Sequence, residues 1–375
     1  MNLLDVSRKQ LLYELYESKK MLYRILNLPV KSQSLVSMSI SPFLSLLCDG
    51  IDNLFSEENT RLSENLGLID EISFTKLMSQ NRASIKLLTD KKISNAIKII
   101  DKQLLSFSTA LTKDYNILQK GFVSIFGQPD LGVYFYKGIA FSNTSQVSIY
   151  QDMFRKLTND DITSDRLGPI MRDFSAIQSS YINTATSLLE GNLLPKIDSI
   201  KCKVNIIDSD FTQEDFIFSN EAKRNVFMNS TIDKNIALYL FNMKCQLLFS
   251  LKLIPQIIER NHALRFRIEM IVYYHSVKTI KFLIQKNKFP LNNITKKIVD
   301  NILVDFNSIF MDNNLRNNIY HYKLSEDNAQ MEVKDDFFIS MVEFQTQQNF
   351  DDIFNIIENN MEKLIGVLDE VTSLN

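Results

Sequence analysis

The chain has 375 residues, and only 16 of them are Gly or Pro, about 4% where average usage is roughly 12%. A sandwich, barrel or doubly wound sheet of this length needs many tight turns, most of which use Gly or Pro at fixed positions. The same scarcity excludes most Gly-rich phosphate loops. The formal net charge of −2 predicts no general affinity for nucleic acid or an anionic membrane. We therefore expect an all-α protein with at most a small β-hairpin or two.

The cysteine pattern and the N-terminus predict a cytoplasmic protein. The three cysteines lie far apart and form no ligand-like pair, so neither a disulfide framework nor a zinc site is expected, and a reducing compartment fits best. The first ten residues, MNLLDVSRKQ, lack the apolar stretch of a signal peptide. The longest apolar stretch, residues 236–258, is interrupted by lysines and glutamines, which predicts a buried core helix and no membrane span.

Apolar periodicity predicts helices through most of the N-terminal half. In residues 3–28 apolar side chains recur every three or four positions, and the pattern stops before Pro29. Two segments differ. Residues 123–141 hold three glycines and predict a small hairpin or a structured loop, and residues 201–219 predict two short strands around a polar turn. The other helices expected in this half cover residues 33–56, 68–80, 82–125, 146–157 and 166–190.

After residue 219 the pattern changes to long, closely spaced helices. A polar insertion, residues 325–349, precedes the last of them. We therefore divide the chain into an N-terminal helical region, residues 1–205, and a C-terminal helical domain, residues 222–375. The four long helices expected in that domain cover residues 232–259, 262–287, 292–316 and 350–372.

Charge is segregated inside the C-terminal domain. Residues 260–297 carry nine basic side chains and one acidic one, whereas residues 298–375 carry four basic and fifteen acidic ones. Either the two parts neutralise each other, or the basic part stays free for an anionic partner. Composition alone leaves both interpretations open.

The sharpest functional signal is a short motif around His321. The chain has three histidines, and neither His262 nor His275 has a second His or a Cys at four-residue spacing, so a zinc site is not expected. No Gly-x-Ser-x-Gly or Gly-Lys-Ser/Thr loop is present, which argues against serine hydrolases and P-loop enzymes. Residues 316–322, RNNIYHY, instead place an Arg, a polar residue and a His in the arrangement R-x4-6-H.

This motif resembles the signature of the HEPN superfamily, the all-helical nuclease domains of many bacterial toxin, CRISPR and abortive-infection systems. The resemblance covers roughly residues 230–375, where long helices precede the motif and an amphipathic helix, residues 350–371, follows it. It implies a HEPN-like bundle of four or five helices and a metal-independent endoribonuclease without a cofactor. It also implies a homodimer in which two motifs face each other. The N-terminal region would then sense a trigger protein or bind an antitoxin.

The chemistry of the motif follows from its residue types. Cleavage of RNA by its own 2′-hydroxyl needs a proton acceptor, a proton donor for the 5′-oxygen and positive charge for the phosphorane, and imidazole and guanidinium can supply these. On a regular helix Asn317 and His321 share a face, whereas Arg316 lies about 140° from His321. One helix alone therefore does not aim both groups at one phosphate. We predict that Arg316 clamps phosphate, His321 is acid or base, and Asn317 orients the imidazole or the substrate.

Basic and aromatic residues of the same domain are candidates for holding RNA, sequence-independently and through its backbone. A competing interpretation is that Arg265 pairs with Glu269 four residues later, that the lysines lie on a solvated helix face and that Tyr322 packs. The candidates are Arg265, Arg267, Lys278, Lys281 and Tyr322.

Two other functions stay open. HEPN-like domains also occur as non-catalytic modules that bind RNA or protein. In the third interpretation the motif is accidental, Arg316 caps the end of a helix, and the chain is a helical scaffold. Cleavage of RNA in the presence of EDTA by the wild type and by Arg316→Ala and His321→Ala variants separates the first function from the other two.

Overall fold

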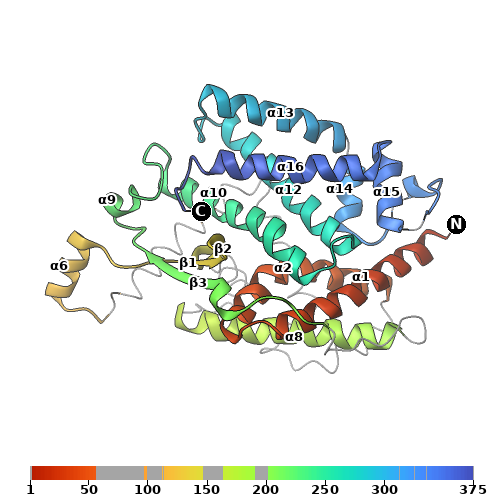
Figure 1. Cartoon of the computed structure of the whole chain (residues 1–375), viewed down its shortest axis with the longest axis horizontal. Coiled ribbons are helices and arrows are strands. Elements are labelled where there is room, and N and C mark those ends of the chain that lie inside the picture. The colour runs from red at the N-terminus through yellow and green to blue at the C-terminus, as the bar shows by residue number, and fades with distance from the viewer. Residues whose placement is uncertain are drawn as a thin grey trace.

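The computed structural model describes residues 2–55, 97–98, 112, 114–146, 164–190, 202–311, 313–324, 326–334 and 336–374. This part of the chain is mostly helical and contains one small three-stranded sheet (Figure 1). The prediction of a mainly helical protein with a small β element is therefore confirmed. The helices expected at residues 68–80, 82–125 and 146–157 lie wholly or largely outside the described residues.

Three helices of the N-terminal region pack side by side: α1 (Leu3–Leu26), α2 (Val30–Leu54) and α8 (Ser164–Glu190). α1 begins at Asn2, whose side chain accepts a hydrogen bond from a backbone N–H of the first turn, and it ends before Pro29 as predicted. Figure 1 shows the three helices as a layer on one side of the C-terminal helices. The predicted first, second and last helices of this half are thus present.

A small antiparallel sheet adjoins this layer. Its strands β1 (Leu131–Tyr136), β2 (Ile139–Asn143) and β3 (Phe211–Phe216) have the order β2-β1-β3. Lys137 and Gly138 connect β1 to β2 with φ angles of 50° and 78°, so this two-residue turn needs the left-handed conformation that Gly adopts without strain. The hairpin predicted from the glycine-containing segment is therefore confirmed.

The segment expected to form two strands, residues 201–219, contributes only β3, which follows a 3-10 turn at Asp208–Asp210. β3 pairs with β1 along its whole length. Its partner is therefore a distant segment of the chain and not a second strand within residues 201–219. Helix α6 (Ile117–Phe126) precedes β1, and the short helix α9 (Glu221–Arg224) follows β3. Figure 1 shows α6 standing at the periphery of the molecule.

The C-terminal helices surround α16, which packs against α10, α12 and α13. β2 packs on α10, so the sheet is joined to this bundle. A 3-10 turn, Glu326–Asn328, lies between α14 and α15. The helices are α10 (Lys234–Leu248), α11 (Ile254–Ile257), α12 (Ala263–Gln285), α13 (Asn293–Ile309), α14 (Asn313–Tyr320), α15 (Phe337–Thr346) and α16 (Phe350–Leu368).

Three predicted boundaries in this domain are corrected. The expected helix 232–259 is interrupted by a π-helical turn, Phe249–Leu253, which ends two residues before Pro255, a residue that cannot donate a backbone hydrogen bond. The expected helix 292–316 ends at Ile309, and the motif lies on the separate helix α14. The polar insertion contains α15, a helix that the sequence analysis did not predict.

Packing explains the end of α13. Phe306 and Phe310 both lie against the ring of Tyr274, with centroid distances of 5.5 Å and 5.1 Å. Phe310 is the C-cap and is buried, so the helix ends where its last aromatic side chain turns into the core. The next helix, α14, begins at Asn313.

The buried apolar side chains form one continuous cluster that runs from Leu11 in α1 to Val371 after α16. α1 itself contacts α11, α12 and α15. The N-terminal helices therefore pack directly on the C-terminal bundle. The domain limits 1–205 and 222–375 stay a prediction, and β3 lies between them.

Within the described residues, two helical stretches are long and apolar enough to cross a membrane by length and composition, Ser32–Leu54 and Lys234–Ile257. Most of each stretch is buried inside the protein, and core helices of soluble proteins pass the same test. In the second stretch the buried Lys244 pairs with Asp369 at 2.7 Å and donates to the backbone carbonyl of Leu374. This environment agrees with the predicted core helix.

Candidate active site

The motif occupies α14 and the residues directly after it. Leu315 and Ile319, four residues apart, are buried and fix the inner face of this short helix. Asn317 lies on the exposed side, and its carbonyl accepts a hydrogen bond from the backbone N–H of His321 at 2.9 Å. The helical hydrogen-bonding pattern thus reaches His321, so His321 follows Asn317 by one helical turn and lies on the same face of the helix.

Asn317 and His321 line one cleft, as their four-residue spacing predicted. The cleft has a volume of about 530 Å³, and its opposite wall is formed by the end of α2. From α2 come Asp49, Gly50 and Asn53. A site built from the motif and from a helix of the N-terminal region is therefore present on the surface.

His321 has an acid beside it in this cleft. Its Nδ1 lies 3.9 Å from Oδ2 of Asp49, and the side chains are 41% and 18% exposed, respectively. Lys323 also lines the cleft and is exposed. The carboxylate thus stands next to the imidazole, and the exposure leaves the ring open to a substrate.

Arg316 does not line this cleft. Its Nη1 donates to Oδ1 of Asn317 at 2.9 Å, and its guanidinium lies over the ring of Tyr320 at 4.8 Å from the centroid. The five-residue spacing therefore sends Arg316 and His321 in different directions. Within the described structure, its hydrogen bond to Asn317 links the Arg to the cleft.

The structure corrects the expectation that Arg267 and Tyr322 present an RNA-binding surface. Both side chains are buried, although the Tyr322 ring also forms part of the lining of the cleft. Arg267 donates to both carboxylate oxygens of Glu14, with Nε–Oε2 and Nη2–Oε1 distances of 2.8 Å. The Tyr322 hydroxyl donates to the same carboxylate. Their polar atoms are used inside the protein, because α1 covers this side of the motif.

Arg265 is corrected for the same reason. It is buried, and its Nε donates to Glu269 at 2.6 Å, as the competing interpretation predicted. Its Nη2 donates to Glu358 of α16 at 2.6 Å. Lys278 is half-buried and lies over the rings of Tyr274 and Phe306, and Lys281 is half-buried on the same helix. Neither lysine lines the cleft, and their contact with RNA stays a prediction.

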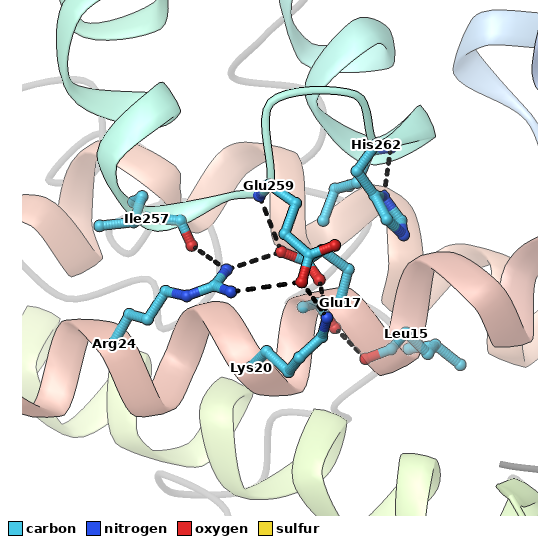
Figure 2. A network of polar contacts seen from close by, with 9 residues as sticks. Leu15, Glu17, Lys20, Arg24, Ile257, Glu259 and His262 are labelled. Atoms are coloured by element: carbon cyan, nitrogen blue, oxygen red, sulfur yellow. Dashed lines mark hydrogen bonds and ion pairs between the residues drawn. The ribbon is translucent and has the colours of Figure 1, made fainter. Parts of the chain in front are cut away.

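A second polar network joins α1 to the loop between α11 and α12 (Figure 2). Glu17 is fully buried and accepts hydrogen bonds from Arg24 at 2.7 Å and from the backbone N–H of Glu259 at 2.9 Å. Lys20 approaches Glu17 at 2.8 Å and also contacts Glu259, while Arg24 donates to the carbonyl of Ile257. Figure 2 shows these side chains converging on Glu17 from both elements. The network fixes α1 against the start of α12.

The other two histidines have packing roles. His262 caps α12 by accepting a hydrogen bond at Nδ1 from the backbone N–H of Leu264, and its ring stacks on Tyr13 at 4.2 Å. His275 is buried, and its ring meets Tyr320 edge-on at 5.5 Å. Among the residues that the structure places, no group of three or more His, Cys, Asp or Glu side chains is arranged to hold a metal ion.

Four residues at or near the site were not predicted from the sequence: Asp49, Asn53, Lys323 and Glu14. Asp49 and Asn53 stand about 270 residues before the motif, and no local pattern marks them. Glu14 does carry a signal, because it and Gln10 are polar side chains one turn apart that lie beside the apolar stripe of α1, next to Leu11 and Leu15. A carboxylate at such a position needs a cationic partner from another element.

Comparison with family models, curated proteins and solved structures finds no match to this chain. The HEPN resemblance therefore rests on the motif and its helical context, and the activity that it implies stays a prediction.

Proposed function

We propose that this protein is a metal-independent endoribonuclease of the HEPN type, acting in the cytoplasm as a bacterial toxin or abortive-infection effector. The observation that carries the proposal is the environment of His321, which is partly exposed on a cleft, 3.9 Å from the Asp49 carboxylate and in register with Asn317. A substrate can reach this imidazole, and the carboxylate of Asp49 lies beside it. These are the requirements of general acid–base catalysis.

In the proposed reaction a neutral His321 takes the proton of a ribose 2′-hydroxyl. The 2′-oxygen then attacks the adjacent phosphorus, and the bond to the 5′-oxygen of the next nucleotide breaks, which leaves a 2′,3′-cyclic phosphate. A protonated imidazole gives its proton to the departing 5′-oxygen. Arg316 stabilises the charge of the phosphorane, and Asn317 orients the imidazole or the substrate.

The direction of Arg316 supports a homodimer. Because it does not line the cleft of its own His321, a guanidinium for that cleft has to come from elsewhere. Asn317 is exposed and His321 is partly so, which leaves this side of α14 accessible to a second copy. We propose that two motifs face each other and that each copy supplies an Arg and a His to a shared site.

Contacts to the RNA backbone are assigned to fewer residues than the sequence alone suggests. Lys323 lines the cleft and joins Lys278 and Lys281 as a candidate phosphate contact. The buried Arg265, Arg267 and Tyr322 are left out. Binding of a trigger protein or an antitoxin by the N-terminal region remains part of the proposal.

The decisive experiment is cleavage of total RNA in EDTA by the wild type and by Arg316→Ala, Asn317→Ala and His321→Ala variants. We expect at least a hundredfold loss of rate for His321→Ala, the typical scale for removing an acid or base. Asn313→Ala is the matched control, since Asn313 is exposed one turn earlier on α14 and does not line the cleft. Undiminished cleavage by both Arg316→Ala and His321→Ala contradicts the catalytic assignment.

Mixing two inactive variants tests the shared site. Heterodimers of Arg316→Ala and His321→Ala retain one Arg316 and one His321, so mixing recovers part of the cleavage activity if the site is composite. Light scattering at micromolar concentration, showing only monomer, contradicts the dimer. The alternative function, a non-catalytic HEPN-like module that binds RNA or protein, is supported if the wild type binds RNA but does not cleave it even after its trigger is supplied.

A further inference from the structure

A buried cluster of Glu14, Arg267 and Tyr322 adjoins the cleft, and the Tyr322 ring forms part of the cleft's lining. Nη1 of Arg267 donates to two successive backbone carbonyls, those of residues 318–319, at 3.0 Å and 2.9 Å. The Tyr322 hydroxyl donates to Oε2 of Glu14 at 2.6 Å. One bond set thus holds the chain just before His321, and the other holds it just after.

Both sets depend on Glu14. The guanidinium of Arg267 lies between the rings of Tyr322, at 4.3 Å, and Phe338, at 4.9 Å, where water does not reach it. The bidentate contact with Glu14 neutralises it, and Gln10 donates a further hydrogen bond to this carboxylate at 2.6 Å. A buried charge without a partner is costly, so Arg267 keeps this position only while Glu14 is present.

We propose that Glu14 is a positioning residue for His321, so that helix α1 of the N-terminal region is part of the catalytic site. The proposal rests on the proposed function. Glu14 touches no reacting group and acts through Arg267 and Tyr322, which fix the backbone on either side of the imidazole. A displacement of α1 therefore moves His321 relative to the cleft.

The contact of α2 with the same segment agrees with this role. A Cβ at Gly50 would lie 2.7 Å from Cδ2 of Tyr322, so α2 can approach the tyrosine this closely only with Gly at that position. The close approach brings the neighbouring Asp49 to His321. α1 and α2, which pack on each other, thus hold Tyr322 and His321 from two sides.

The test compares Tyr322→Phe with Tyr320→Phe. Both remove one buried hydroxyl and keep the ring, but in the described structure only the Tyr322 hydroxyl binds Glu14, whereas that of Tyr320 has no hydrogen-bond partner. For each full-length variant, kcat and KM of RNA cleavage are measured in EDTA. The imidazole signals of ¹³C-labelled histidine are recorded by NMR, and with three histidines in the chain the His321 signal is assigned by its absence from His321→Ala.

We expect Tyr322→Phe to lower kcat about tenfold with KM within twofold, the pattern of lost placement, and to shift the His321 signal. Tyr320→Phe leaves both unchanged. A change in kcat without a shift of the signal, a shift without a change in kcat, or no change in either overturns the proposal. If the wild type cleaves no RNA even after its trigger is supplied, the proposed function fails, and the His321 signal alone decides whether the cluster positions the imidazole.

Arg267→Lys provides a second variant. Lysine keeps the charge next to Glu14, but its single ammonium cannot bind the carboxylate and both carbonyls with the geometry of a planar fork. We expect the same loss of kcat and the same direction of shift as in Tyr322→Phe. A fully active, folded Arg267→Lys protein with an unshifted His321 signal overturns the proposal.

Discussion

Replacing Glu14 by Gln tests the buried ion pair behind the motif most directly. The side chain keeps its size but loses the charge that balances Arg267, and its amide NH₂ group has to face the guanidinium or the Tyr322 hydroxyl. Removing one partner of a buried ion pair costs about 3–5 kcal/mol. The amide oxygen still offers Arg267 an acceptor, so we expect a loss near the lower end, about 3 kcal/mol of the free energy of unfolding.

Urea denaturation at neutral pH measures this loss, and Arg267→Met with the double variant completes a double-mutant cycle. The second substitution removes the charge that the first leaves unpaired. We therefore expect the double variant to lose less than the sum of the single losses, by at least about 1 kcal/mol. A loss below about 1 kcal/mol for Glu14→Gln, or strictly additive losses, refutes the reasoning.

The dependence on pH gives an independent check. Burial alone would raise the pKa of Glu14, but the charge and hydrogen bonds of Arg267, with hydrogen bonds from Tyr322 and Gln10, hold this pKa below its usual value of 4.5. The folded state therefore favours the ionised carboxyl, and this contribution is present above pH 4.5 and is lost as the pH falls through the folded-state pKa. The difference in stability between the wild type and Glu14→Gln narrows in acid. A difference that stays constant down to pH 2 contradicts the assignment.

Three further predictions concern single positions. Burial raises the pKa of the Glu269 carboxyl to about 7, so the folded state favours its protonated form. The wild type therefore loses up to about 3 kcal/mol of its free energy of unfolding as the pH rises from 4.5 to 7. Urea denaturation at pH 5 and pH 8 measures this loss, and we expect Glu269→Gln to lack it. Gly50→Ala places a Cβ against Tyr322 and costs about 1–3 kcal/mol, seen as a lower Tm, and an unchanged Tm contradicts the close packing. Asp49→Asn removes the carboxylate beside His321, and we expect it to slow RNA cleavage about fivefold. This factor is equivalent to roughly 1 kcal/mol, the interaction of two charges 4 Å apart in water. An unchanged rate argues against a contribution of Asp49 to the action of His321.

Helices and turns with local causes were predicted correctly. The stripe of α1 ends before Pro29 because proline cannot continue the helix, and the hairpin forms at Lys137 and Gly138 because its two-residue turn needs positive φ angles. Both causes lie within a few residues of the structure that they determine. They are therefore visible in the sequence without knowledge of the packing.

Element ends that depend on packing were not predicted. The sequence between Phe310 and Leu315 contains no Gly or Pro that would end a helix, and the packing of Phe310 on Tyr274 shows why α13 ends there. α15 was missed because the residues around it are polar, although its own apolar side chains are buried against α16 and α1. Such ends depend on the partner of a helix face, which periodicity does not reveal.

In the candidate site too, the features that depend on local spacing were predicted and those that depend on packing were not. The shared face of Asn317 and His321, and the separate direction of Arg316, follow from helical geometry and are present as expected. The choice of Arg265 and Arg267 as surface residues did not hold, because charge density in a sequence does not show which cations are buried against acids. Arg267 stands 253 residues from Glu14, and the structure joins them.

By itself the sequence determined the helical class, the hairpin and the register of the motif, because these depend on residue types and spacings within a few turns. The tertiary structure alone decided that Asp49 stands beside His321 and that Glu14 holds the chain around it. Those contacts join residues about 270 and 310 positions apart. They exist because α1, which carries Glu14, packs on the C-terminal helices, and because α2, which carries Asp49, packs on α1.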